Sequence, residues 1–170
     1  MKINKDILYG ILTGMLVCAF TMIEYLMGYH NAKIADGRFL NLLGNLIPVT
    51  VIAIAIIYKK KNDNGYLELK DGMKTGIIIS FFTGVITTAF MFIYNDYINP
   101  EYLKISFDYQ VKLFTERGYS ADDITKFKEG FESSQKLGSQ LMAGLLWTPL
   151  LGMLPSLIIT LILRKNRPIA

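Results

Sequence analysis

The sequence predicts an all-α membrane protein in which four helices cross a lipid bilayer as one bundle. Three observations predict this fold: long apolar runs, small residues repeated at four-residue spacing in two of these runs, and basic residues gathered at the ends of the runs. Of the 170 residues, 52% are hydrophobic. Because a soluble domain is usually about 45–50% apolar, the placement of the apolar residues is more informative than their number.

Four apolar runs with few charges match the length of a membrane-spanning helix. At a rise of about 1.5 Å per residue, about 20 residues cross a hydrocarbon core of about 30 Å. The predicted spans are residues 7–27, 39–58, 76–98 and 141–163. We treat residues 1–170 as a single membrane domain, with residues 99–138 as a helical insertion between the third and fourth spans.

Small residues recur every four positions in the third and fourth spans, and this spacing keeps them near one helix face. The third span carries Gly72, Gly76, Ser80, Gly84 and Thr88, and the fourth carries Gly144, Thr148, Gly152, Ser156 and Thr160. Lipid does not drive apolar helices together as water does, so membrane helices associate where small residues let their backbones approach. We predict helix packing at Gly76, Ser80, Gly84, Gly144, Gly152 and Ser156.

The placement of charge predicts the orientation of the bundle, although the net charge is only +4. An even number of spans puts both termini on one side of the membrane. That side collects the basic runs at the span ends, Lys59, Lys60, Lys61, Arg164, Lys165 and Arg167, together with Lys2 and Lys5. Basic residues near span ends favour the cytoplasmic side, so both termini are predicted to be cytoplasmic.

The long connection after the third span reads as an extracytoplasmic helical hairpin. Pro100 ends the span, Gly118 is a helix stop, and Ser120 with Asp123 is a capping pair for a second helix. Apolar residues repeat at helical spacing on both segments: Leu103, Phe107, Val111 and Phe114, then Ile124, Phe127 and Phe131. These faces are predicted to pack on each other; the membrane surface and a partner protein are the alternatives.

Glu24 lies inside the first predicted span, and an acid within a span is a candidate for function. At the depth that the topology implies, Asn41, Asn45 and Thr148 lie in the same layer, and they form a candidate polar cluster with Glu24. Thr87, Thr88, Asn95 and Trp147 lie at a similar depth. A structural ion pair with Lys33 or Arg38 is the favoured explanation of Glu24, and a proton or cation site is the alternative.

The sequence does not indicate catalysis. It has one histidine, His30, and one cysteine, Cys18, so neither a His/Cys metal cluster nor an internal disulfide is expected. No glycine-rich phosphate loop follows a strand, and the lysines beside the spans need no nucleic acid to explain them. We therefore predict no catalytic residues, no metal, no cofactor and no nucleic-acid partner.

Several segments resemble a known family. The segments are Gly72-Met73-Lys74-Thr75-Gly76 with Ser80, the stretch from Tyr94 to Asn99-Pro100-Glu101-Tyr102, and Gly118-Tyr119-Ser120. They are similar to a bacterial family catalogued only as domain of unknown function 4199, and the similarity covers nearly all of the chain. The resemblance implies a small protein with four membrane helices and no assigned activity.

Two functional hypotheses follow for a multi-pass protein of the bacterial inner membrane. The first is a non-enzymatic accessory or interaction protein that acts through the small-residue stripes or the hairpin. Besides the lipid bilayer, it would contact a membrane protein partner or a second copy of itself. The alternative is a small transporter or channel subunit that uses the polar cluster around Glu24.

Overall fold

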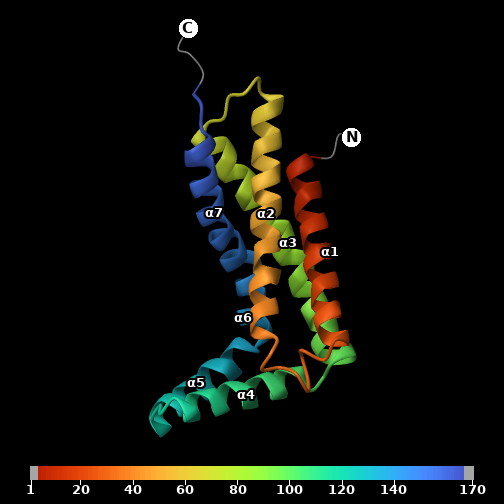
Figure 1. The fold of residues 1–170 in the computed structure, drawn as a ribbon, viewed down its shortest axis with the longest axis vertical. Coiled ribbons are helices and arrows are strands. Elements are labelled where there is room, and N and C mark those ends of the chain that lie inside the picture. The colour runs from red at the N-terminus through yellow and green to blue at the C-terminus, as the bar shows by residue number, and fades with distance from the viewer. Residues whose placement is uncertain (1–3, 167–170) are drawn as a thin grey trace.

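The computed structural model describes residues 4–166, and the predicted basic residues Lys2 and Arg167 lie outside this range. Figure 1 shows an elongated helical bundle with a helical hairpin across one end. In chain order the helices are α1 (Lys5–Leu26), α2 (Arg38–Asn62), α3 (Leu69–Ile93), η1 (Tyr94–Ile98), α4 (Tyr102–Glu116), α5 (Ala121–Ser134), α6 (Leu137–Met142), η2 (Ala143–Trp147) and α7 (Thr148–Leu163). The two elements η1 and η2 are single π-helical turns.

Four helical stretches are long and apolar enough to span a membrane: Lys5–Leu26, Phe39–Asn62, Leu69–Ile98 and Leu137–Leu163. The predicted all-α fold with four spanning helices is therefore confirmed. The third helical stretch begins at Leu69, before the predicted span that starts at Gly76. A helix can extend beyond the apolar residues that form its membrane span. The fourth likewise begins at Leu137 and passes through α6 and η2 before α7.

Helices α3 and α7 approach each other along the two small-residue stripes. A Cβ added at Gly72 would overlap the side chain of Thr160, and one at Gly76 would overlap that of Ser156. In the same way Gly152 meets Ser80, and Gly144 meets Thr88. The partner numbers fall along one stripe as they rise along the other, which is the pattern of antiparallel helices. Side chains larger than those present would separate the two backbones.

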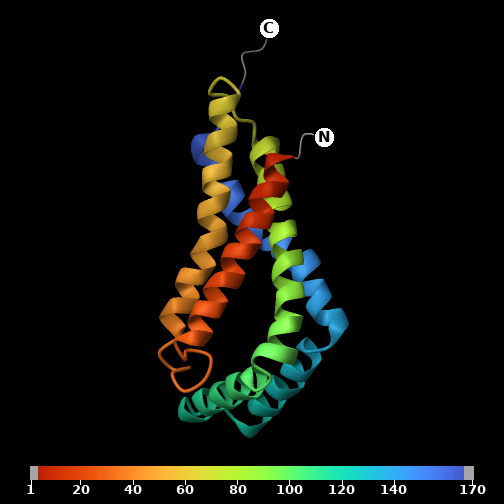
Figure 2. The ribbon, with the colours of Figure 1, turned by 90° about the vertical axis from the view of Figure 1, so that its right-hand side faces the viewer.

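Helix α1 approaches α3 from another side through Gly10 and Gly14. A Cβ at Gly10 would lie 2.8 Å from the carbonyl oxygen of Ile79, and a Cβ at Gly14 would lie 2.6 Å from the Cβ of Ile86. The hydroxyl of Thr83 donates to the carbonyl oxygen of Gly10, at 3.2 Å. Helix α3 is thus in close contact with both α1 and α7; Figure 2 shows α3 (green) beside α1 (red to orange).

The end of the bundle that carries the termini is closed by an apolar core and a small polar cluster. The core consists of Ile52, Ala55, Ile56, Leu67 and Ile79. Beside it, Lys59 Nζ lies 3.5 Å from a carboxylate oxygen of Asp6. The hydroxyl of Thr75 accepts from Lys59 at 2.8 Å and donates to Asp6 at 3.2 Å. Helix α2 is therefore fastened to its neighbours near this end.

The outward faces of the long helices carry exposed large apolar side chains. Leu26 is 76% exposed, and Ile162 on α7 is also 76% exposed. In a soluble protein such surface would be a liability, whereas in a bilayer it contacts lipid tails. The chain is thus a multi-pass membrane protein with lipid around its long helices.

The helical hairpin α4–α5 packs through contacts between aromatic rings. The ring centroids of Phe107 and Phe127 lie 5.7 Å apart, and those of Phe114 and Phe127 lie 4.8 Å apart. Ser120 and Asp123 form the predicted capping box at the start of α5, and Gly118 takes a φ of 75° in the turn. Of the three predicted environments for the apolar faces, the ring contacts correspond to self-packing.

The close approach of α3 and α7 predicts that Gly76→Ala destabilises the bundle. Its new Cβ would overlap Ser156, and overpacking of this kind costs about 1–3 kcal/mol. Thermal unfolding in detergent, followed by circular dichroism, measures the loss. Gly130→Ala in α5 is the matched control, because a Cβ there meets nothing within 4 Å and should stabilise the helix by up to about 1 kcal/mol. Equal stability of the two variants would contradict the packing described.

Candidate functional site

Glu24 lies in the last turn of α1, and the chain reverses directly after it. Gly28 takes a φ of 83°, the left-handed conformation that glycine adopts at little cost. The N–H of Tyr29 then donates to the carbonyl oxygen of Glu24, at 2.9 Å. This turn folds the following loop back over the end of the helix. His30 is thereby placed against Glu24, and both residues are 5% exposed.

His30 joins Glu24 to a buried hydrogen-bond network. Its Nε2 lies 3.6 Å from Oε2 of Glu24, and its Nδ1 lies 2.6 Å from the hydroxyl oxygen of Tyr94. The side-chain amide of Asn99 donates to that same hydroxyl oxygen at 3.2 Å, and to Oδ1 of Asn31 at 3.1 Å. Tyr94, which is fully buried, belongs to η1.

These bonds are satisfied when the neutral ring of His30 carries its hydrogen on Nε2. Because Tyr94 accepts from Asn99, its own hydrogen is free to go to Nδ1 of His30. In a neutral ring the remaining hydrogen then sits on Nε2, which faces the carboxylate of Glu24. The network therefore directs one N–H toward Oε2.

Burial keeps the His30 ring neutral. Removal from water lowers the pKa of His30 from its ordinary value of 6.5. The ring of Tyr102, from α4, packs on His30 with 4.6 Å between the centroids. Burial first, and the charge of Glu24 second, raises the pKa of Tyr102. Both groups are thus uncharged at neutral pH.

Glu24 lines a cavity between the helices. Oε1 is buried and has no hydrogen-bond partner. The cavity has a volume of about 250 Å³ and opens between the spanning helices; we call it the acid cavity. Its walls are Val17, Phe20, Thr21, Glu24, Asn41, Gly44, Asn45, Pro48, Thr83, Thr87 and Thr148. The candidates Glu24, Asn41, Asn45 and Thr148 thus meet at one cavity, although Asn41 and Asn45 are themselves exposed.

The hydroxyl groups of the acid cavity face it mainly as acceptors. Thr21 donates to the carbonyl of Val17 at 3.0 Å, Thr87 to that of Thr83 at 2.9 Å, and Thr148 to that of Ala143 at 3.1 Å. Each hydroxyl donates its hydrogen to a carbonyl of its own helix, so its lone pairs can accept a hydrogen bond from another partner.

The two asparagines and a proline of α2 add further oxygens. Asn41 and Asn45 each donate an amide hydrogen to the carbonyl one turn earlier, at 3.3 Å and 2.9 Å. Pro48 has no N–H, so the carbonyl of Gly44 lacks its usual helical donor. Both Gly44 and Pro48 line the cavity. The walls therefore combine one carboxylate with several neutral oxygen acceptors.

Several residues of this site differ from what the sequence predicted. The partner of Glu24 is His30, whereas we expected Lys33 or Arg38. The Nζ of Lys33 instead lies 5.9 Å from the centroid of the Tyr29 ring. The side chain of Arg38 is outside the described part of the structure. Sequence reasoning also missed Tyr94, which is 0% exposed and hydrogen-bonded to His30. The sequence signal for the contact between Glu24 and His30 was Gly28, a glycine between them at which the chain can reverse direction.

The polar residues expected at one depth divide between two neighbouring cavities. Thr88, Asn95 and Trp147 line a second cavity, which meets the first at Thr87 and Thr148. Within residues 4–166, no group of three or more His, Cys, Asp or Glu side chains could hold a metal ion. The acid cavity offers a single formal charge.

These features define the class: a multi-pass integral membrane protein whose spanning helices enclose a buried carboxylate. The chain belongs to the family described as a protein of unknown function, DUF4199, whose model matches residues 8–165. This match confirms the family resemblance carried by Gly72 to Gly76 and Asn99 to Tyr102. No curated protein and no solved structure matched the chain.

The neutral, buried His30 predicts a pH dependence of stability. Because the folded-state pKa is lowered, the unfolded chain binds the proton first as the pH falls below 6.5. The contribution of His30 is therefore fully present above that pH and is lost as the pH falls through the lower folded value. Glu24, Tyr94 and Tyr102 are the titratable groups that contact the ring. Thermal unfolding in detergent between neutral and acidic pH should show a smaller loss in His30→Asn than in the wild type; equal losses would contradict a neutral His30.

Proposed function

We propose that this protein is a small transport subunit that binds a monovalent cation at Glu24. The observation that carries the proposal is the unpartnered Oε1 of a buried carboxylate beside the acid cavity. Ionisable side chains within membrane helices are costly and rare, and those present usually have a function. A cation beside Oε1 would offset that cost.

The chemistry of the walls supports a cation of single charge. Carboxylate, amide, hydroxyl and carbonyl oxygens suit hard cations and protons. Glu24 is the one acidic residue among the residues of the cavity wall, so one positive charge neutralises it. The volume of about 250 Å³ exceeds that of a bare ion and leaves room for water molecules around it.

The alternative, a non-enzymatic accessory or interaction protein, has less support from the geometry. The small-residue stripes contact each other within the chain, and the phenylalanines of the hairpin contact each other. The surfaces that would recruit a partner are therefore largely occupied. A membrane-protein partner or a second copy of the chain remains a prediction, and the proposal assigns no catalytic reaction.

Flux measurements in liposomes test the transport proposal. Purified protein is reconstituted, and uptake of radioactive sodium, of radioactive rubidium and of protons is followed under matching gradients. The wild type should carry at least one of these ions, and Glu24→Gln should reduce its flux to that of empty liposomes. Glu129→Gln, at an exposed carboxylate of α5, is the matched control and should behave as the wild type. Wild-type flux in Glu24→Gln would refute the proposal.

We further propose that the bundle lies in the bacterial inner membrane with both termini cytoplasmic and the hairpin outside. Figure 1 draws the start of α1 and the end of α7 at the end of the bundle opposite the hairpin. That end also carries Lys59, Lys60 and Lys61 in the last turn of α2. Basic residues beside span ends favour the cytoplasmic face, which supports this orientation.

Cysteine labelling tests the orientation. The only cysteine, Cys18, is replaced by alanine, and single cysteines are introduced by Gly130→Cys in the hairpin or Lys61→Cys after α2, both exposed positions. A membrane-impermeant maleimide should label the hairpin cysteine in intact spheroplasts and the other one only after lysis. The reverse pattern would invert the orientation and place the acid cavity in the cytoplasmic half.

A further inference from the structure

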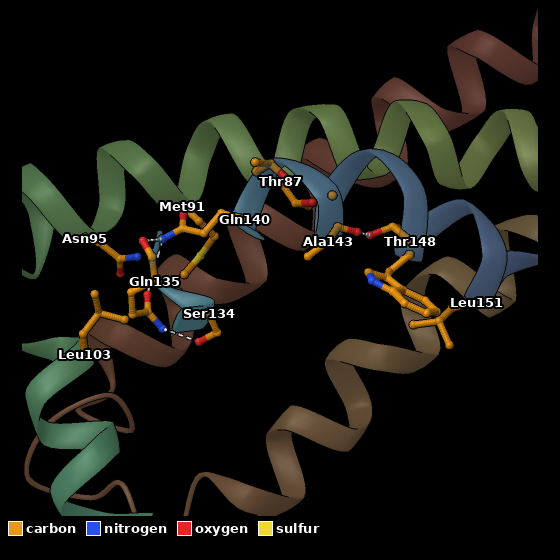
Figure 3. Close-up of a pocket in the computed structure, with 13 residues that line it drawn as sticks. Thr87, Met91, Asn95, Leu103, Ser134, Gln135, Gln140, Ala143, Thr148 and Leu151 are labelled. Atoms are coloured by element: carbon orange, nitrogen blue, oxygen red, sulfur yellow. Dashed lines mark hydrogen bonds between the residues drawn. The ribbon is translucent and has the colours of Figure 1, made fainter. Parts of the chain in front are cut away.

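A second cavity lies between α3, the base of the hairpin and η2. Its volume is about 410 Å³, and Figure 3 shows the side chains around it. The lining residues are Thr87, Thr88, Met91, Asn95, Leu103, Ser134, Gln135, Gln140, Ala143, Gly144, Trp147, Thr148 and Leu151. None of these residues is charged. We call this space the amide cavity, because three of its lining residues, Asn95, Gln135 and Gln140, have side-chain amides.

Asn95 gives the amide cavity an unsatisfied acceptor. Its Oδ1 is buried and has no hydrogen-bond partner. Asn95 follows Tyr94 in the π-helical turn η1, and the turn directs Tyr94 to His30 while Asn95 faces this cavity. A buried acceptor without a donor is uncommon in proteins and is a reason to expect a ligand that donates.

The polar and apolar walls of the amide cavity are separated along the membrane axis. Gln140 donates to the backbone carbonyl of Gln135 at 3.0 Å, and Gln135 donates to the hydroxyl of Ser134 at 3.2 Å. These amides stand with Asn95 at the hairpin end, where the chain leaves the membrane (Figure 3). Trp147 and Leu151 lie further into the fourth span and are 60% and 63% exposed to the bilayer side.

We propose that the amide cavity binds one uncharged lipid amphiphile with a hydroxyl-bearing headgroup, such as a glycerol ester. The headgroup donates to Oδ1 of Asn95 among the amides, and the acyl chain leaves past Trp147 and Leu151 into the bilayer. This order of polar and apolar walls matches the order of a lipid that enters from the membrane. The absence of charge from the lining residues selects against ionic headgroups, whose desolvation would be uncompensated.

The size of the amide cavity agrees with a headgroup and the first part of a chain. A volume of about 410 Å³ equals roughly 14 water molecules at their share of liquid volume. The rest of an acyl chain would lie in the surrounding lipid. This inference concerns a different cavity from the cation site and does not depend on transport.

Trp147 provides a direct assay, because it is the only tryptophan in the chain and it lines the cavity. The full chain is reconstituted in unlabelled phosphatidylcholine vesicles, and two probes brominated on the acyl chain are added at equal mole fractions. One is a monoacylglycerol, and the other is the methyl ester of the same fatty acid, which lacks hydroxyl groups. The monoacylglycerol should quench Trp147 at about fivefold lower mole fraction, the equivalent of one net hydrogen bond.

Two variants connect the quenching to the proposed contact. Asn95→Ala should bring the monoacylglycerol to the level of the methyl ester, and it should fold, because its Oδ1 has no protein partner to lose. Thr88→Val, which removes another hydroxyl from the wall without changing its shape, is the second variant. Gln110→Ala in α4 is the matched control, because that amide does not line the cavity.

The outcomes separate cleanly. Preferential quenching by the monoacylglycerol that Asn95→Ala abolishes would support the site. Equal quenching by both probes, or wild-type quenching in Asn95→Ala, would overturn it. Stronger quenching by a brominated phosphatidylglycerol would overturn the assignment of an uncharged headgroup. The flux assay of Glu24→Gln is a separate measurement, and neither result decides the other.

Discussion

The close approach of α3 to two neighbours is the constraint on which the rest of the structure depends. Small residues bring α7 against one side of α3, and Gly10 with Gly14 brings α1 against another. With these contacts fixed, α2 is fastened mainly near the termini, where Ile52, Ala55 and Ile56 form the core. Toward the hairpin its face carries Asn41 and Asn45, which do not fill the space between the helices. The acid cavity is thus a consequence of tight packing elsewhere.

Several polar groups inside the bundle share one hydrogen-bonding pattern, which helps to explain where the unsatisfied atoms lie. In lipid, a hydroxyl or amide must find a partner within the protein, and the nearest is a carbonyl one turn back on its own helix. Thr21, Thr87 and Asn45 use this solution, which spends donors and leaves acceptors. Among the described residues, the buried side-chain atoms without a partner are Glu24 Oε1, Asn95 Oδ1 and Thr160 Oγ1. All three are oxygens, and the first two belong to residues that line cavities.

The fold could be predicted from the sequence better than the site could, for physical reasons. Span length and four-residue spacing act along one helix, so the stripes of α3 and α7 could be recognised without a structure. The same signal was present at Gly10 and Gly14, but a single pair is less conspicuous than a long stripe. Depth in the membrane also follows from sequence position, which is why Glu24, Asn41, Asn45 and Thr148 could be grouped. The rotation of a helix about its own axis does not follow from sequence position. Only the structure therefore shows the two π-helical turns, the burial of Tyr94 and the contact of His30 with Glu24.

The two cavities share part of their walls, which would link the occupancies that we propose for them. Thr87 and Thr148 border both the acid cavity and the amide cavity. Each hydroxyl is held by a carbonyl of its own helix, and the carbonyl that holds Thr148 belongs to Ala143 in η2. A ligand that displaces η2 from the amide side would therefore move an oxygen acceptor of the proposed cation site. Binding free energies at coupled sites are linked. A cation that draws Thr148 inward would therefore change the affinity for lipid by the same factor by which lipid changes the affinity for the cation. A π-helical turn suits such an element, since its wider hydrogen-bond ring is a local departure from the α-helix and these turns are common at functional sites.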